Sequence, residues 1–352
     1  MAFDDHPLGT PESYRHRVRY AVAAVVTTLV LLAILWITRQ AVLLIFLGIT
    51  VGVLFFRTSR WLADRTGVPR SATLAVVVLA VLAGLAAAGT FGGPRVVSEA
   101  RALVDDAPTL IETARSRLGL PEGVLALPGR VEDISGRLLG VFSSFAGGVA
   151  GVLVVLLVAV YTAADPTRYT DGVVRLVDRE HQPFIRRVLD RAAEVLLGWL
   201  KGVGIAVVVL GTLAAIGLTV IGVPGALALA AFAGAMTVIP NFGPFIGWVP
   251  ALVVAFSQGT TMGLWTLGLA VIAQQIEGSF ITPKVQGEMV KVGPAFIIAG
   301  QIVLGTLAGF LGVLLVVPVL GVGKVLLQEL YIGPMVNGES AEPQPEASGD
   351  VC

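Results

Sequence analysis

Long uncharged apolar runs are the feature of this sequence that most limits its fold. Residues 20–37, 41–56, 71–91, 141–162 and 202–222 contain no charged side chain and are rich in valine, leucine, alanine and glycine. A helix of about 20 such residues crosses the roughly 30 Å hydrocarbon layer of a bilayer. Hydrophobic residues make up 55% of the 352-residue chain and charged residues 14%, against about 25% charged in soluble domains. The pattern predicts an all-α, polytopic integral membrane protein.

Beyond residue 222 the apolar runs become short and paired, with one full-length run, 262–280, between the two pairs. Proline and glycine separate the arms of each pair, and Pro318 is expected to interrupt the last arm. Each pair predicts either a re-entrant hairpin or two thin crossings, giving about eight membrane helices in all. The pairs are 225–239 with 245–256, and 295–307 with 310–327.

Two polar segments show amphipathic helical spacing. Residues 93–140 predict helices broken near Pro108 and Pro121. They form either an extramembrane lid or vestibule, or a spacer on the membrane or a neighbour; we favour the spacer, because the pattern alone requires no ligand. Asp165-Pro166 predicts a helix start, and an amphipathic helix then runs into the 202–222 span.

The charge distribution sets the expected topology. Arginines flank the N-terminal run and fill the 57–70 loop, whereas Arg39 alone lies in the link expected between the first two helices. Because cytoplasmic loops are enriched in Lys and Arg, we expect a multi-pass cell-membrane protein with both termini in the cytoplasm. The regions are 1–92 (tail and three helices), 93–140 (amphipathic segment), 141–201 (fourth helix and cytoplasmic amphipathic helix), 202–330 (transport core) and 331–352 (disordered tail).

Several functions are disfavoured by composition. The formal net charge is zero, and no basic and aromatic cluster suits nucleic acid. Cys352 is the single cysteine and the three histidines are scattered, so we expect no disulfide, metal or cofactor. Without a phosphate-binding loop or a hydrolase motif, we do not expect an enzyme. The expected partners are the lipid bilayer and a small-molecule or ion substrate.

A few polar residues in apolar surroundings are candidate functional groups. Glu277 ends the 262–280 run, where it could carry a proton, bind a cation or hold a gate; equally, it could pair with Lys284 at the interface. Asn241 lies in a turn too apolar for plain solvent exposure, which favours contact with a solute or ion over an ordinary surface loop. Gln301 is a lone amide that could bond another helix or a ligand.

Residues 200–330 resemble the autoinducer-2 exporter family in the order and spacing of their motifs. The motifs are Gly222-Val223-Pro224; Ile239-Pro240-Asn241-Phe242-Gly243-Pro244 with Pro250-Ala251; Gln274-Gln275-Ile276-Glu277-Gly278 with Pro283-Lys284 and Gly287; and Pro294 with Gly305, Gly309, Gly312 and Val317-Pro318. Gly293 stands where the family usually has histidine, and Val203 where it often has glutamine. The resemblance implies a homo-oligomeric secondary transporter, with members associated with autoinducer-2 export, and hence quorum sensing, or with sodium/proton antiport.

Broken helices at matched places are the strongest sequence indication of a transporter binding site. We therefore predict an exporter of a small polar molecule driven by an ion or proton gradient. The alternatives are a sodium or lithium/proton antiporter and a non-transporting membrane scaffold. The expected transport region is Asn241, Gly243, Pro244 and Glu277, with Gln275 and Pro283 shaping its exit.

Overall fold

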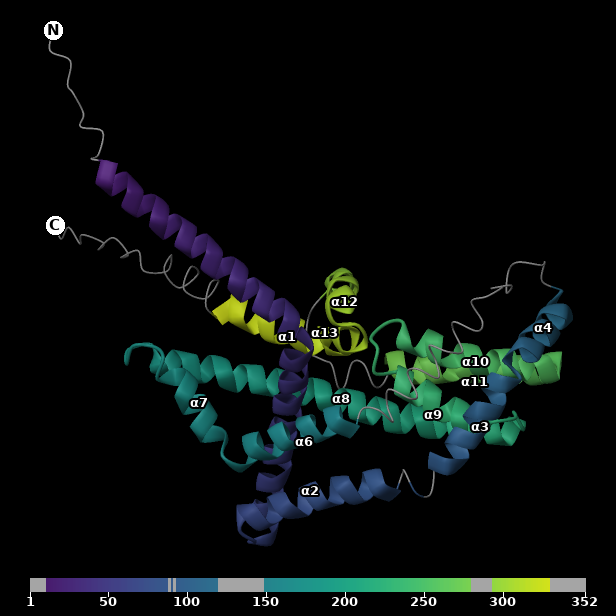
Figure 1. Ribbon diagram of the computed structural model, residues 1–352. Helices are drawn as coiled ribbons and strands as arrows, with labels where there is room; N and C mark the ends of the chain where they lie inside the picture. Colours follow the sequence, from purple (N-terminus) through teal and green to yellow (C-terminus); the bar gives the residue numbers. More distant parts are fainter. Residues whose placement is uncertain (1–10, 88–89, 91–92, 120–148, 280–292, 330–352) are drawn as a thin grey trace, which may run out of the picture.

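The computed structural model describes residues 11–87, 90, 93–119, 149–279 and 293–329, and every regular element within these ranges is a helix (Figure 1). The prediction of an all-α protein is confirmed. The helices are α1 (Pro11–Thr66), α2 (Arg70–Ala87), α3 (Gly93–Asp105), α4 (Ala107–Leu118), α6 (Val149–Ala164), α7 (Pro166–Val174), α8 (Gln182–Ile221), α9 (Ala226–Met236), α10 (Gly243–Gln258), α11 (Thr260–Ile276), α12 (Pro294–Ala308) and α13 (Phe310–Leu327).

Several of these helices are long and apolar enough to cross a membrane. Among the described residues, four pass by length and composition: Trp36–Thr66 of α1, α2, α8 and α13. A fifth results if α6 and α7, which bend by 80° at their junction, count as one broken span. Large apolar side chains on these helices are exposed, as lipid-facing residues must be. The protein is therefore a polytopic membrane protein, and its described residues include four or five full-length spans together with shorter apolar helices.

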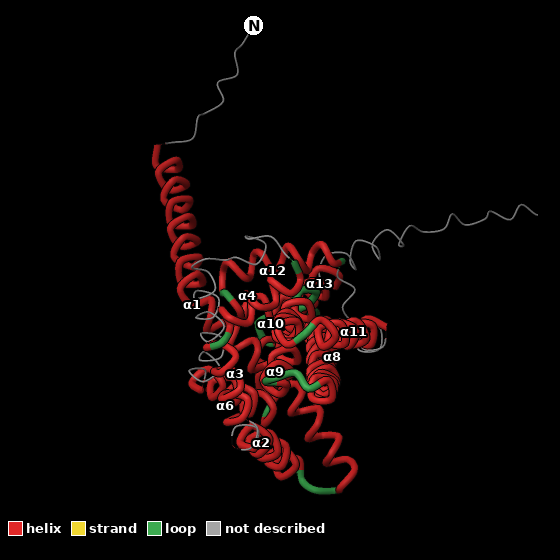
Figure 2. The backbone as a smooth tube through the Cα atoms, turned by 90° about the vertical axis from the view of Figure 1, so that its right-hand side faces the viewer, coloured by secondary structure: helices red, strands yellow, loops and turns green. Residues whose placement is uncertain are grey.

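The first two predicted membrane helices form one continuous helix. The link expected at Arg39 is absent: α1 runs unbroken for 56 residues, about 84 Å. No proline or glycine lies between residues 12 and 47 to end the helix, and Arg39 donates to the Trp36 carbonyl while lying over the Trp36 ring. Figure 1 shows that α1 changes direction along its length, and its N-terminal limb stands clear of the other helices (Figures 1 and 2).

Close glycine contacts join α1 to α6. A Cβ at Gly48 would lie 2.6 Å from Val158 Cβ, and one at Gly52 would lie 2.9 Å from the Ala159 oxygen. Such small residues, four apart, let membrane helices approach closely. Arg70 at the start of α2 then donates to the last two carbonyls of α6, at 2.7 and 3.0 Å. Helices α1, α2 and α6 therefore form one packed N-terminal unit.

The predicted helix start at Asp165 is confirmed. The Asp165 carboxylate accepts hydrogen bonds from the Arg168 backbone N–H and the Thr167 hydroxyl, which caps α7. A second helix, α8, begins at Gln182 and continues for 40 residues into the predicted membrane span. Arg186 pairs with Asp171 of α7, and Arg191 pairs with Glu329 beyond α13. The amphipathic half of α8 is thus held to two other parts of the chain.

Both predicted interrupted pairs are helical hairpins. In the first, Gly247 of α10 lies against the Ala233 backbone of α9, so the two helices run antiparallel. In the second, Gly309 alone joins α12 to α13, and Gly300 and Gly305 face Val316 and Val313. Helix α9 is about 16 Å long, too short to cross the hydrocarbon layer, which favours a re-entrant first hairpin.

The interruption predicted at Pro318 is wrong, because α13 continues through this proline. Pro318 is fully buried, and a buried proline in a membrane helix is tolerated where neighbouring protein surrounds the freed backbone. Helix α10 likewise continues through Pro250.

The amphipathic segment forms two helices, broken as predicted beside Pro108. Asp106 separates α3 from α4, and Gly119 in a left-handed conformation ends α4. Helix α3 packs on α9 and α4 on α10, so this arm lies against the first hairpin. Pro121 and the rest of the predicted segment lie outside the described residues.

Candidate functional site

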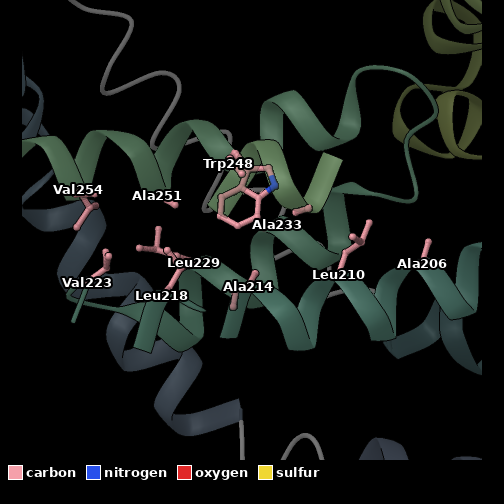
Figure 3. Close-up of a cluster of buried hydrophobic side chains, with 14 residues drawn as sticks. Ala206, Leu210, Ala214, Leu218, Val223, Leu229, Ala233, Trp248, Ala251 and Val254 are labelled. Carbon is pink, nitrogen blue, oxygen red and sulfur yellow. The ribbon is translucent and has the colours of Figure 1, made fainter. Parts of the chain in front are cut away.

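An alanine-rich core lies where α8, α9, α10 and α11 meet (Figure 3). Eight of its fourteen buried residues are alanine, and Trp248 is its one aromatic residue. Apolar side chains gain little by leaving lipid for one another, so membrane helices associate through close packing of small residues. A Cβ at Gly234 of α9 would lie 3.0 Å from the Gly211 Cα of α8, so these two backbones nearly touch. The short helix α9 is therefore sandwiched between α8 and α10.

The turn between α9 and α10 contains three residues of the predicted transport region. Asn241 is exposed and has a positive φ of 63°, a conformation that asparagine tolerates better than most residues. Gly243 and Pro244 are buried, and a Cβ at Gly243 would overlap the Met236 carbonyl oxygen. Glycine at 243 is therefore required by the close return of the chain onto α9.

A hydrogen bond connects this turn to the second hairpin. Gln301 of α12 donates through Nε2 to the Pro240 oxygen at 2.8 Å, and the Gln301 side chain is nine-tenths buried. Val313 of α13 packs beside Phe232, Met236 and Ile239 of the first hairpin. The two interrupted pairs, 61 residues apart at this bond, therefore meet directly.

The amide of Gln301 has a fixed orientation and one unsatisfied atom. Because the Pro240 carbonyl can only accept, the amide must turn its NH₂ group towards it. Its Oε1 is then buried without a donor among the described residues. A buried acceptor without a partner costs about 1–3 kcal/mol.

Two polar groups lie on the inward face of α11. Thr266 is fully buried with no partner for its hydroxyl, and Glu277, which follows the helix, has Oε2 buried with no donor in the described part of the chain. Gly263, Ala270 and Ala273 complete this inward stripe at helical spacing. Gln275 lies off the stripe and is exposed. Pro283 and Lys284, the predicted partner of Glu277, lie outside the described residues.

The predicted residues gather at one end of the α10–α11 pair. Gly259 alone joins these packed helices, so the start of α10, at Gly243 and Pro244, lies at the same end as Gln275 and Glu277 at the close of α11. The turn at Asn241 leads directly into that end. Gly243, Pro244, Gln275 and Glu277 thus lie at one end of this helix pair, and their role in transport stays a prediction. From the sequence, Gln301 was a lone amide with no partner assigned.

The electrostatic character of the region is neutral. Residues 202–276 contain no Asp, Glu, Lys, Arg or His, and neither do residues 293–323. Two carboxylates outside the spans have lowered pKa values: the Thr167 hydroxyl and the Arg168 N–H hold the pKa of Asp165 below its usual value, and Arg115 lowers the pKa of Glu112. No group of three or more His, Cys, Asp or Glu occurs in the ranges that the structure covers. The two hairpins therefore offer amide and carbonyl groups in place of charges.

Comparison of the sequence with known proteins identifies the family to which the chain belongs. Residues 25–332 match the family described as "AI-2E family transporter". The chain belongs to this family. "Putative transport protein YrrI" of Bacillus subtilis is 26% identical over 313 residues, which cover 83% of this AI-2E transporter and 87% of the relative. "Putative transport protein MT0215" of Mycobacterium tuberculosis is 25% identical over 323 residues, covering 86% and 87%.

A third relative, "Putative transport protein sll0060" of Synechocystis, is 22% identical over 280 residues, covering 74% of this chain and 80% of the relative. The matched region of the family runs through both hairpins and the N-terminal unit. The resemblance read from the motifs is confirmed, and the protein is a membrane transporter of the AI-2E family.

Proposed function

We propose that this chain exports a small polar solute of the autoinducer-2 type across the cell membrane, driven by an ion or proton gradient. The observation that carries the proposal is the junction between the hairpins, where Gln301 donates to Pro240. Irregular backbone at membrane depth must be buried in protein or line a cavity, because lipid satisfies no N–H or C=O group. Paired broken helices are where transporters of several folds bind their substrates.

The chemistry of this junction suits a neutral, hydrogen-bonding solute. A charged solute buried between uncharged hairpins would lose its hydration without gaining an opposite charge to offset that cost. In this proposal Asn241 contacts the solute from the turn, and Gly243 and Pro244 set the path of the backbone. Glu277 takes part in gating or ion coupling, while Gln275 and Pro283 shape the exit.

A second candidate function, sodium or lithium/proton antiport, is favoured by Glu277. It is the first charged residue after Lys201, and one of its carboxylate oxygens is buried without a donor within the described ranges. A carboxylate in such a place is a functional candidate by default. Antiport needs this group to exchange a proton for a cation, whereas solute export needs it only for coupling.

Counterflow in proteoliposomes separates these functions. Purified protein is reconstituted with candidate neutral solutes inside, and uptake of labelled solute is followed with and without imposed sodium and pH gradients. Solute counterflow that falls in Asn241→Ala and Glu277→Gln supports export. A sodium-dependent pH change without solute movement would support antiport instead of export. A protein that is inactive in both assays would support the non-transporting scaffold.

The proposed function also includes a membrane orientation and a homo-oligomeric assembly. We propose that both termini lie in the cytoplasm, since arginines flank the N-terminal run. Because α1 is one helix whose candidate span is Trp36–Thr66, this orientation puts the arginines of residues 57–70 towards the opposite side. Impermeant thiol reagents test this at native Cys352 and at a cysteine introduced near residue 5. Labelling of these two cysteines from opposite sides of the membrane would overturn the shared cytoplasmic placement. The homo-oligomer implied by the family resemblance is tested by light scattering of the purified protein.

A further inference from the structure

The arm formed by α3 and α4 makes contacts that a simple spacer does not need. It lies along the first hairpin, with α3 on α9 and α4 on α10, and Figure 1 shows it crossing the bundle of α8 to α11. Ala114 of α4 is 1% exposed, and Leu103 and Leu110 pack against the alanine-rich core. The arm therefore shares the apolar interior of the hairpin instead of resting beside it.

A carboxylate from this arm caps α9. Glu99 Oε2 accepts a hydrogen bond from the Ala228 backbone N–H at 3.0 Å, across 129 residues of sequence. Ala228 lies in the first turn of α9, where backbone N–H groups have no partner within the helix. The residue at the head of α9 is Gly225, which has no side chain to supply a cap. A negative charge at this end also complements the helix dipole.

An apolar contact fixes the same end. A Cβ at Gly225 would lie 2.7 Å from Leu103 Cδ1, so the Leu103 side chain sits directly on the backbone that begins α9. Gly225 has a positive φ of 68°, which suits glycine. Glu99 and Leu103 are four residues apart on α3 and so lie on one face. One face of α3 thus holds the head of α9 by a polar and an apolar contact.

We propose that Glu99 is a positioning residue for the transport hairpin and that the arm, residues 93–118, is a permanent clasp holding α9 in its working orientation. An 11-residue helix is marginal alone, and Gly225 offers no side-chain cap, so Glu99 supplies the acceptor that the first turn of α9 lacks. This inference rests on the proposed function in taking the α9–α10 hairpin as the transport element. It assigns the arm to the transport machinery, in place of the spacer that the sequence favoured.

Substitutions at Glu99 test the proposal in the full-length protein. Glu99→Ala removes the cap, and we expect the maximal counterflow rate to fall about tenfold, the factor equivalent to about 1.4 kcal/mol, with a smaller change in the half-saturating solute concentration. Glu99→Gln keeps an acceptor oxygen and should retain most of the rate. Asp105→Asn, an exposed acid on the same helix, is the matched control and should change nothing. Wild-type transport by Glu99→Ala would overturn the proposal.

A reversible tether distinguishes positioning from loss of fold. Leu103→Cys with Gly225→Cys, in a Cys352→Ser background, places two thiols where Leu103 Cγ lies 3.1 Å from the Cβ position at 225. The same pair with Glu99 retained is the reference, because cysteine at the positive φ of residue 225 is strained. Under oxidising conditions the disulfide should restore transport to the Glu99→Ala variant, and reduction should abolish it again. Failure of the oxidised tether to restore transport would show that Glu99 does not act by holding α9.

Hydrogen exchange keeps the inference separate from the transport assignment. The Glu99→Ala variant should exchange amides 226–230 about tenfold faster than wild type, and Asp105→Asn should not. Faster exchange in a protein that moves no solute would refute the proposed function alone. Unchanged exchange would refute the clasp, whatever the protein transports.

Discussion

Replacing Gln301 by leucine removes both the donor and the acceptor of its amide, whose effects on stability have opposite signs. The substitution removes the Nε2 bond to Pro240, a loss of about 0.5–1.5 kcal/mol. It also removes Oε1, whose unpaired burial costs about 1–3 kcal/mol. The Pro240 oxygen is not orphaned, because it still accepts from the Phe242 N–H at 2.8 Å. We expect Gln301→Leu to be about 1 kcal/mol more stable than wild type, while solute flux falls severalfold.

Two further substitutions sharpen this expectation. Gln301→Glu turns a carboxyl group towards the Pro240 carbonyl in an uncharged environment, and we expect it to lose several kcal/mol of stability if it ionises. Gln258→Leu is the matched control, because Gln258 is another lone amide but is exposed at the end of α10. It should change neither stability nor flux.

Thermal unfolding of the purified protein in detergent and counterflow in proteoliposomes measure the two effects independently. A higher unfolding temperature together with reduced flux is the expected pairing for Gln301→Leu. Clear destabilisation, by about 2 kcal/mol or more, would show that the bond to Pro240 outweighs the unpaired oxygen. Full flux in a stable protein would remove the hairpin junction from the transport route.

Three further outcomes follow from local geometry. Gly243→Ala should destabilise by about 3 kcal/mol, because its methyl group overlaps the Met236 carbonyl, and thermal unfolding measures this. Arg70→Ala should cost about 2 kcal/mol by leaving the last carbonyls of α6 without their donor, whereas Arg60→Ala, exposed on α1, should be neutral in the same assay. The pKa of Asp165 is lowered on folding, so its contribution is present above the pKa of the unfolded aspartate and is lost as pH falls through the folded value. In the Asp165→Ala variant, the unfolding temperature should therefore fall less steeply than in wild type as the pH is lowered.

The elements best predicted from sequence were those fixed by local chemistry. Pro108 placed the break between α3 and α4, Asp165 with Pro166 placed the start of α7, and the glycines around 309 placed the second hairpin turn. Each depends on backbone preferences of a few neighbouring residues, which the sequence states directly. The interruption at Pro318 failed because surrounding protein overrides the preference of a single proline.

The long-range contacts could not be predicted from the sequence. Arg39 suggested a loop by its charge, yet it pairs within the helix and α1 continues. Gly48 and Gly52 form a visible small-residue pattern, but their partner α6 is some hundred positions away. The bond from Gln301 to Pro240 and the cap from Glu99 depend on how distant segments meet, so no local pattern encodes them.

The length of α8 has a mechanical consequence. At 40 residues it is a stiff rod of about 60 Å, tied at its polar end to Asp171 and Glu329 and touching α9 at Gly211 towards its other end. For such a rod, a tilt of about 5° about Gln182 would move Gly211, 29 residues along, by about 4 Å. A small tilt of α8 at its ion pairs would therefore reach the close contact between Gly211 and Gly234 as a displacement of several ångströms.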